Sequence, residues 1–244
     1  MSIELYWLGK DESAPFPDVG MALDEPDGLL AAGGDLSETR LLNAYRHGIF
    51  PWFSNGQPIL WWSPNPRMVF RTNGIHLSQK FIRQLRQSTW QICVDTCFDE
   101  VIRQCASVPR AGQRGTWIHP EMIDAYGHLH RQGHAHSVEV FSNGKLIGGI
   151  YGISIGRMFF GESMFSLESG ASKAALAALG RILHGWGWPL LDAQVENPHL
   201  QFMGAEFMER EKFVLEVARL SSLAEVPGLW SGRIAPFAAT ECTS

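Results

Sequence analysis

Two short segments of the sequence place acidic and amide side chains inside apolar runs, a pattern typical of a reaction site. Glu162 lies in the segment Gly161–Ser166, and Asp192 and Gln194 lie in the segment Leu191–Asn197. A carboxylate can hold an ammonium group or accept a proton, and an amide can both donate and accept hydrogen bonds. Because side chains alternate along a strand, Asp192 and Gln194 are expected on one face. For Asp192 the alternative is a structural role, in which it satisfies a neighbouring backbone group.

An alanine-rich stretch, residues 171–184, predicts a helix between the two segments. A strand, helix, strand crossover of this length makes the two strands parallel and usually adjacent. Glu162 and the Asp192/Gln194 pair are then expected to face one crevice. Gly161 inside a strand indicates a bulge, which would reset the facing of Glu162, so its facing relative to its strand neighbours stays open.

The elements before this crossover complete an α+β fold with a mixed, mostly antiparallel sheet. Asn143-Gly144 and Gly156-Arg157 predict tight turns between three antiparallel strands. A ligand cleft is expected where the parallel and antiparallel parts of the sheet meet. Helices are predicted at residues 39–47, 78–87, 98–107 and 120–132, strands at 90–94, 136–142, 145–153 and 158–165, and a loop around Gly112–Gly115.

A proline-rich boundary precedes this part of the chain. Pro64 and Pro66 disfavour both helix and central strand, and they predict a small N-terminal domain at residues 1–65 and a larger domain at 66–244. The first helix should begin at a capping box, Asp35 to Glu38, and end at Gly48. Trp52, in an aromatic stretch beside the boundary, is a candidate ligand contact, and packing between the domains is the alternative.

Charge is distributed unevenly along the chain. The net charge is -5, yet residues 39–94 contain seven Lys and Arg residues and no Asp or Glu, so this tract carries +7 and the remainder -12. A local positive field attracts phosphate even when the total charge is negative. Lys80, Arg83 and Arg86 recur every three residues on one predicted helix, which favours a polyanion such as tRNA. A solvated helix face is the alternative.

Several protein classes lack their usual signals in this sequence. There is no apolar stretch of about 20 residues and no signal peptide, so a cytoplasmic protein without membrane association is expected. The four cysteines have no paired CxxC spacing and are expected to be free thiols. His128, His130, His134 and His136 straddle a predicted helix end, so neither a metal nor a cofactor is expected. No Walker loop, GxGxxG or Gly-x-Ser-x-Gly elbow is present, which disfavours covalent catalysis.

Seven strings in order resemble the bacterial leucyl/phenylalanyl-tRNA–protein transferases, over about residues 15–210. They are Leu29–Leu36, Tyr45–Phe53, Pro58–Arg67, Gly115–Ile118, Gly133–Ser137, Gly161–Ser166 and Leu191–Asn197. The resemblance implies a small N-terminal α/β domain followed by a GNAT-type acyltransferase domain. It also implies an aminoacyltransferase that moves leucine or phenylalanine from tRNA to proteins beginning with Arg or Lys, which marks them for proteolysis. Leucyl-tRNA and phenylalanyl-tRNA are the implied donors, with methionyl-tRNA as a further candidate.

The resemblance also assigns residues. It implies that Asp192, Gln194 and Glu162 form the reaction centre and that Lys80, Arg83 and Arg86 bind the tRNA acceptor stem. The implied aminoacyl-adenosine and amino-acid pocket consists of Trp52, Trp117, Tyr45, Ile150, Phe159, Met164 and Leu191, with Tyr45 supporting Trp52.

The implied reaction is aminolysis of an ester, in which the acceptor amine is the nucleophile, so positioning is the main task of the enzyme. In this hypothesis Asp192 holds the amine and orients Gln194. Either Asp192 or a ribose hydroxyl of the tRNA accepts the proton, while Glu162 binds the donor ammonium or the cationic acceptor side chain. Two alternatives are an acetyl-CoA-dependent GNAT-type acetyltransferase and a non-catalytic tRNA-binding module.

Overall fold

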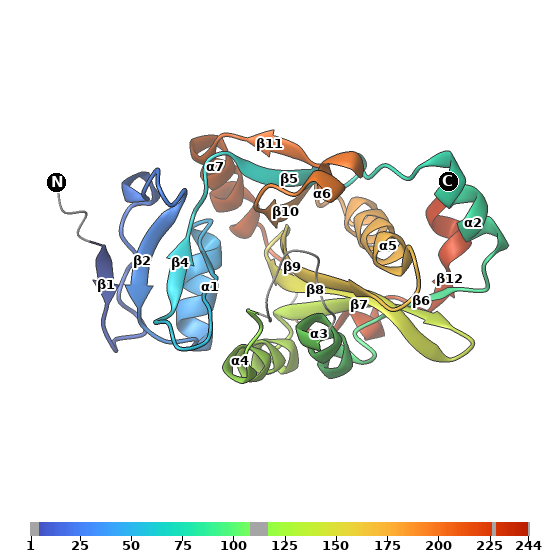
Figure 1. Cartoon of the computed structure of the whole chain (residues 1–244), viewed down its shortest axis with the longest axis horizontal. Coiled ribbons are helices and arrows are strands. Elements are labelled where there is room, and N and C mark those ends of the chain that lie inside the picture. Colours follow the sequence, from blue (N-terminus) through green and yellow to red (C-terminus); the bar gives the residue numbers. More distant parts are fainter. Residues whose placement is uncertain (1–4, 108–116, 226–227, 244) are drawn as a thin grey trace.

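The computed structural model describes residues 5–107, 117–225 and 228–243, which form two sheets with helices around them (Figure 1). The smaller sheet has the strand order β1-β2-β4-β3. Its strands are β1 (Tyr6–Leu8), β2 (Leu29–Gly33), β3 (Phe50–Pro51) and β4 (Leu60–Trp62), and the short helix η1 (Val19–Met21) and helix α1 (Glu38–Arg46) lie in the same part of the chain.

The larger sheet has eight strands in the order β11-β5-β10-β9-β8-β7-β6-β12. Within it β9 and β10 run parallel, and the other neighbours in this order run antiparallel. The predicted α+β class with a mixed, mostly antiparallel sheet is therefore confirmed. The strands are β5 (Arg67–Arg71), β6 (Gln91–Val94), β7 (Ala135–Ser142), β8 (Lys145–Ile155), β9 (Met158–Ser166), β10 (Leu190–Gln194), β11 (Glu206–Met208) and β12 (Phe237–Ala238).

Helices cover both faces of the larger sheet. The apolar core on one face contains side chains of α5 and α2, and the core on the other contains those of α3, α4 and α7 together with α1. Figure 1 shows α2 and the C-terminus at the end of the molecule opposite β1. The helices are α2 (Gln79–Gln87), α3 (Phe98–Ser107), α4 (Pro120–Arg131), α5 (Ala171–Gly185), α6 (Pro198–Phe202) and α7 (Arg210–Ser221), with the short helices η2 (Trp230–Gly232) and η3 (Ala239–Thr243) near the C-terminus.

Most local predictions are confirmed, with one correction at a helix cap. Ser37, and not Asp35, is the N-cap of α1, because its hydroxyl accepts the backbone N–H of Arg40. Asp35 instead accepts the N–H of Ser37 and so supports the cap. Gly48 follows α1 with a φ of 73°, in the left-handed region that glycine tolerates. The loop predicted around Gly112–Gly115 lies outside the described residues.

The predicted strand, helix, strand crossover is confirmed, and its two strands separate where the cleft was expected. Parallel pairing of β9 and β10 joins Phe159 to Leu191 and Phe160 to Asp192. Beyond these pairs β9 continues along β8, and the register of β10 shifts against β5. The register of β9 also shifts, because Gly161 is opposite Gly152 while Ser163 is opposite Tyr151. Glu162 is the extra residue of this bulge, so the bulge predicted from Gly161 is present.

The two sheets meet in a shared core, and the chain passes from one to the other between β4 and β5, through residues 63–66. Buried residues of the smaller sheet and α1 belong to the same apolar cluster as those of α3, α4 and α7. The boundary between residues 65 and 66 lies in this connection, and a division into two domains there stays a prediction. Among the described residues, no helix combines the length and apolar character that a membrane crossing requires.

Candidate active site

A cavity of about 280 Å³ opens where β9 and β10 separate. Its floor is polar, with Glu162, Asp192 and Gln194, while much of its wall is apolar. Pockets of this kind, apolar with a few converging polar groups, are typical ligand sites. The lining consists of Phe50, Pro51, Trp52, Phe70, Trp117, Ile150, Gly161, Glu162, Ser163, Met164, Leu176, Leu191, Asp192, Ala193, Gln194, Val195, Asn197 and Leu200.

Asp192 is held by a buried arginine. The Nε and Nη2 atoms of Arg67 donate to the two carboxylate oxygens of Asp192 at 2.8 and 2.6 Å, and both side chains have no exposed area. The guanidinium also donates to the carbonyl of Gly48 and lies between the rings of Phe50 and Phe213. A bidentate pair of this kind fixes both partners, and removing one partner would leave the other charge buried and unpaired.

Asp192 in turn fixes the backbone of Gln194. The Gln194 N–H donates to Oδ1 of Asp192 at 2.9 Å, and Gln194 has a φ of 63° at the register shift of β10. The Gln194 side chain then reaches across the gap between the strands, where Nε2 donates to Oε1 of Glu162 at 2.7 Å. Because its nitrogen is used in this way, the amide oxygen is left to accept a hydrogen bond from another group. Asp192 and Gln194 both line the cavity, although the register shift between them interrupts the strand alternation from which a shared face was predicted.

Two buried tyrosines hold Glu162 from the other side. The Tyr45 hydroxyl lies 2.7 Å from Oε1 and the Tyr126 hydroxyl 3.1 Å from Oε2, and the two hydroxyls are 2.5 Å apart. Burial, the largest cause, raises the pKa of the Glu162 carboxyl to about 8, although the hydrogen bonds from the tyrosines and Gln194 oppose the rise. Burial also raises the pKa of both tyrosines well above the usual range, so they stay protonated.

The number of protons that these contacts require also indicates that the Glu162 carboxyl is protonated, in agreement with its raised pKa. Three oxygen–oxygen contacts join Glu162, Tyr126 and Tyr45, and each needs one proton. The tyrosines supply two, so an ionised Glu162 would leave one contact between two oxygens without a hydrogen. A protonated Glu162 supplies the third. At neutral pH, Glu162 is therefore mainly a neutral carboxylic acid and a poor partner for a cation.

Tryptophans form the outer wall of the cavity. Trp52 keeps 38% of its surface exposed, and its ring centroid lies 5.8 Å from that of Trp62. The Trp62 indole N–H donates to the Trp52 carbonyl at 2.6 Å, which fixes this part of the wall. Trp117 lines the same cavity. Exposed, fixed indole rings can stack on planar groups such as nucleobases.

The structure gathers most of the predicted pocket residues. Trp52, Trp117, Ile150, Met164 and Leu191 line the cavity. Tyr45 and Phe159 do not belong to the lining.

Those two residues lie behind the wall. Tyr45 contacts Glu162 and Tyr126 and packs on Phe160, so it supports Glu162. It was predicted to support Trp52, but the ring that lies beside Trp52 is that of Trp62. Phe159 is buried, with its ring 5.7 Å from that of Trp230.

Lys80, Arg83 and Arg86, called here the basic face of α2, lie on the exposed side of that helix, away from the buried Phe81 and Leu85. Arg86 also donates to the hydroxyl of Thr243.

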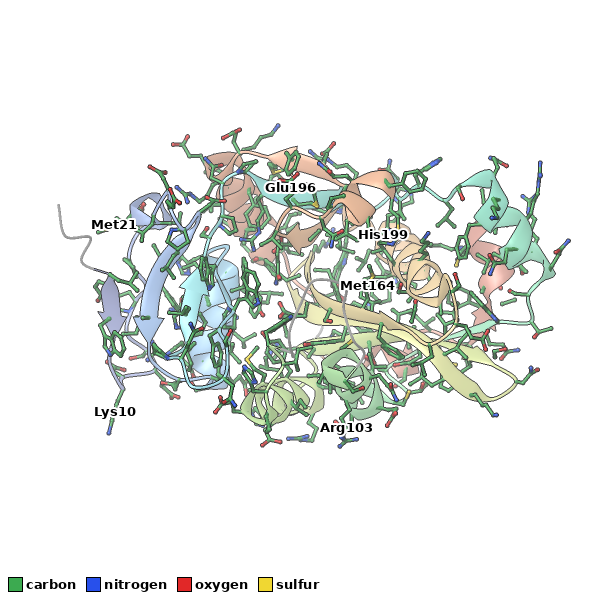
Figure 2. The ribbon with its side chains drawn as sticks, in the orientation of Figure 1. Lys10, Met21, Arg103, Met164, Glu196 and His199 are labelled. Atoms are coloured by element: carbon green, nitrogen blue, oxygen red, sulfur yellow. The ribbon has the colours of Figure 1, made fainter. Side chains whose placement is uncertain are left out.

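The four clustered histidines do not converge. His128 and His134 approach Glu38, His130 contacts the carbonyl of Ala135, and His136 pairs with Asp95. Within the described part of the chain, no three His, Cys, Asp or Glu side chains come together in the way that a metal site needs. Figure 2 shows Met164 of β9 beside α5, with Glu196 and His199 nearer to α6.

Sequence reasoning missed two residues that support the site. Arg67 follows two prolines in the basic tract, and the lack of any Asp or Glu near it in the sequence was the available signal. Tyr126 follows Met122 by four residues on the buried face of α4, where nothing distinguishes it from a core aromatic.

Family models of leucyl/phenylalanyl-tRNA protein transferases match the chain in two parts. The N-terminal domain model matches residues 34–65, and the main model matches residues 69–218. A leucyl/phenylalanyl-tRNA–protein transferase of Xanthomonas euvesicatoria pv. vesicatoria (strain 85-10) is 64% identical over 233 residues, covering 96% of this chain and 93% of the relative. The enzyme of the same name from Xylella fastidiosa (strain M23) is 57% identical over 231 residues, covering 95% of each.

Similarities to solved structures are weaker. A conserved protein of unknown function from Staphylococcus epidermidis ATCC 12228 has a TM-score of 0.40 and 11% identity, over 74% of this chain and 68% of that one. A GCN5-related N-acetyltransferase from Kribbella flavida has a TM-score of 0.37 and 9% identity, over 66% and 56% of the two chains.

Proposed function

The chain belongs to the leucyl/phenylalanyl-tRNA–protein transferase family, and on this basis we propose that it transfers an amino acid from aminoacyl-tRNA to the N-terminal amine of proteins. The proposed donors are leucyl-tRNA and phenylalanyl-tRNA, with methionyl-tRNA as a further donor. The proposed acceptors begin with Arg or Lys, and the product carries a new N-terminal residue that marks it for proteolysis. The proposed location is the cytoplasm, and the proposed domains are residues 1–65 and 66–244.

The observation that supports this function best is the polar array at the split between β9 and β10. Glu162, Gln194 and Asp192 are linked by hydrogen bonds beside an apolar cavity, and Arg67 anchors the array. Each member is held by at least two partners. A preorganised amide in a cavity suits a reaction in which both reactants arrive from outside and need to be aligned.

The proposed step is aminolysis of an ester. The neutral amine of the acceptor attacks the carbonyl carbon of the aminoacyl ester, a C–N bond forms, and the C–O bond to the terminal ribose breaks. The amine loses one proton and the departing ribose oxygen gains one, so the step needs no external reactant. An N-terminal amine has a pKa of about 7.7 to 8.0, so an appreciable fraction is neutral near pH 7.

In this proposal Gln194 aligns the amine. Its Nε2 is held by Glu162, so its Oε1 accepts a hydrogen bond from the attacking N–H. Asp192 is a positioning residue, because its carboxylate is bound by Arg67 and by the Gln194 N–H. A carboxylate held in this way is poorly placed to collect the proton, which favours the vicinal ribose hydroxyl as the route to the leaving oxygen.

The amino-acid side chain and the tRNA occupy different regions in this proposal. Ile150, Met164 and Leu191 form an apolar wall for leucine or phenylalanine, and Trp52 and Trp117 face the adenosine. The basic face of α2 contacts the phosphates of the acceptor stem. One methylene in an apolar pocket changes selectivity by about 1 to 3 kcal/mol, so rejection of smaller amino acids should be graded.

The test mixes the purified protein with tRNA charged with radiolabelled leucine and an acceptor protein that begins with Arg. Label should move to the acceptor, and the same acceptor with an acetylated N-terminus should receive none. Binding of tRNA without any transfer to the free amine would overturn the proposed function.

A further inference from the structure

A second cavity of about 320 Å³ adjoins the one already described. Phe50, Trp52 and Val195 line both cavities, so the two share a wall. The second cavity is also bounded by residues of the boundary segment and of β11, including Pro64, Pro66 and Phe207. Its volume is in the range of ligand pockets, about 300 to 1,000 Å³.

The charged residues in the lining of this second cavity are both acidic. Asp27 accepts the backbone N–H of Asn65 through Oδ1. Glu196 is exposed and makes no hydrogen bond or ion pair that involves the described residues. Arg210 approaches the same boundary segment, but its guanidinium donates to the carbonyl of Ser63. The cavity therefore has a negative rim with unused acceptor capacity.

Aromatic rings complete the lining. Trp52, Trp62, Phe50 and Phe207 all contribute to it, and Trp52 and Phe207 keep 38% and 44% of their surfaces exposed. A ring face attracts a cation, and the attraction grows when the cation is partly removed from water. Aromatic faces together with carboxylates form an environment suited to a guanidinium or ammonium group on an apolar stem.

Because the side chain of Glu162 is enclosed, a cationic group of the acceptor needs a different partner. Glu162 was the sequence-based candidate for binding the cationic side chain of the acceptor, but it is enclosed by two tyrosines and Gln194. A cationic side chain in the reaction therefore needs another carboxylate. Glu196 follows Gln194 by two residues and lines the second cavity, next to Trp52 and Val195, which line both cavities.

We propose that the second cavity is the subsite for the cationic side chain of the acceptor's first residue, with Glu196 and Asp27 as its charge partners and Trp52 as its aromatic face. The proposal rests on the proposed function and gives it a structural basis for acceptor choice. An acceptor amine at Gln194 would place its side chain along Val195 into the second cavity, while the aminoacyl group stays in the first.

The experiment compares peptides that begin with Arg or with citrulline, which has nearly the same shape without the charge. Binding of each peptide is measured by calorimetry, and kcat and KM for transfer are measured at saturating leucyl-tRNA. The variants are Glu196→Gln, Asp27→Asn and the double variant, since both changes remove charge and keep an acceptor oxygen. Glu121→Gln on the exposed side of α4 is the matched control.

We expect each single change to weaken Arg-peptide binding and raise its KM about threefold, and the double change about tenfold, with kcat retained. Citrulline-peptide values should stay unchanged in every variant, as should the KM for leucyl-tRNA. An Arg preference over citrulline that survives intact in the double variant would overturn the subsite. So would a raised KM for leucyl-tRNA in place of the peptide, because the cavity would then serve the donor. Failure of the wild-type protein to transfer leucine, with peptide binding still sensitive to these variants, would overturn the proposed function and leave the subsite supported.

Discussion

Replacing Glu162 by Gln should remove a pH-dependent contribution to stability without disrupting the site. Gln has nearly the same shape as a protonated Glu, and it can donate to the Tyr126 hydroxyl and accept from Tyr45 as the neutral acid does. Since the carboxyl is neutral in the folded protein at pH 7, the substitution should keep the hydrogen-bonded group around it intact.

The magnitude follows from proton linkage. The pKa of Glu162 is about 8 in the folded protein, raised from an ordinary value of 4.5. Between these values the folded state holds a proton that the unfolded state has lost, so the stability from this group is full below pH 4.5 and is lost as pH rises towards 8. The slope is about 1.4 kcal/mol per pH unit, which gives about 2 to 3 kcal/mol between pH 6 and pH 8. The variant lacks this slope.

The assay is urea unfolding of both proteins at intervals from pH 5.5 to pH 9. The free energy of unfolding of the wild type minus that of the variant should fall by about 2 to 3 kcal/mol between pH 6 and pH 8. Above pH 8 this difference should level off. Glu139, whose pKa burial raises to about 7, titrates equally in both proteins and cancels in the difference. Glu139→Gln is the control. The free energy of unfolding of the wild type minus that of Glu139→Gln should level off near pH 7. A wild-type-minus-Glu162→Gln difference that does not change with pH, or that rises with pH, would refute the neutral state of Glu162.

Three further predictions concern stability, tRNA and selectivity. Asp192→Asn should lower the free energy of unfolding by about 3 to 5 kcal/mol in urea titrations, because it leaves Arg67 buried without its charge partner; a loss below 1 kcal/mol would contradict the buried pair. Changing the three residues of the basic face of α2 to Ala should reduce the slope of log binding constant against log salt by about two to three, whereas Lys10→Ala, at the opposite end of the molecule in Figure 2, should not. Ile150→Ala should raise the ratio of phenylalanine to leucine transfer about tenfold, measured as kcat/KM for each charged tRNA, and an unchanged ratio would remove Ile150 from the pocket.

The sequence predicted the frame of the site because its signals are local. The turn at Asn143-Gly144 has φ values of 49° and 74°, as a tight hairpin requires, and Gly161 marked the bulge that contains Glu162. The length of the crossover determined that β9 and β10 run parallel. Asp192 and Gln194 do line one cavity, but the register of β10 shifts between them, so the alternation from which a shared face was predicted does not hold there.

The electrostatic state of the site could not be predicted, because it depends on contacts far apart in the sequence. Asp192 is paired with Arg67, 125 residues away, and Glu162 with Tyr45, 117 residues away. A carboxylate next to an arginine and a carboxyl enclosed by tyrosines have the same local sequence signal. The raised pKa of Glu162 appears only when its burial and its partners are known.

Single-turnover transfer by a Gln194→Asn variant tests the central claim most directly. Asn keeps the amide and tolerates the φ of 63° at this position, but its side chain is one methylene shorter, so the amide is withdrawn from Glu162 and from the amine. We expect leucine transfer at saturating substrates to slow by about 100-fold, the scale of a misplacement near 1 Å, with leucyl-tRNA affinity unchanged and the free energy of unfolding lowered by about 1 to 3 kcal/mol, the cost of one buried hydrogen bond. Transfer at the wild-type rate by this folded variant would contradict the claim that Gln194 aligns the reacting amine.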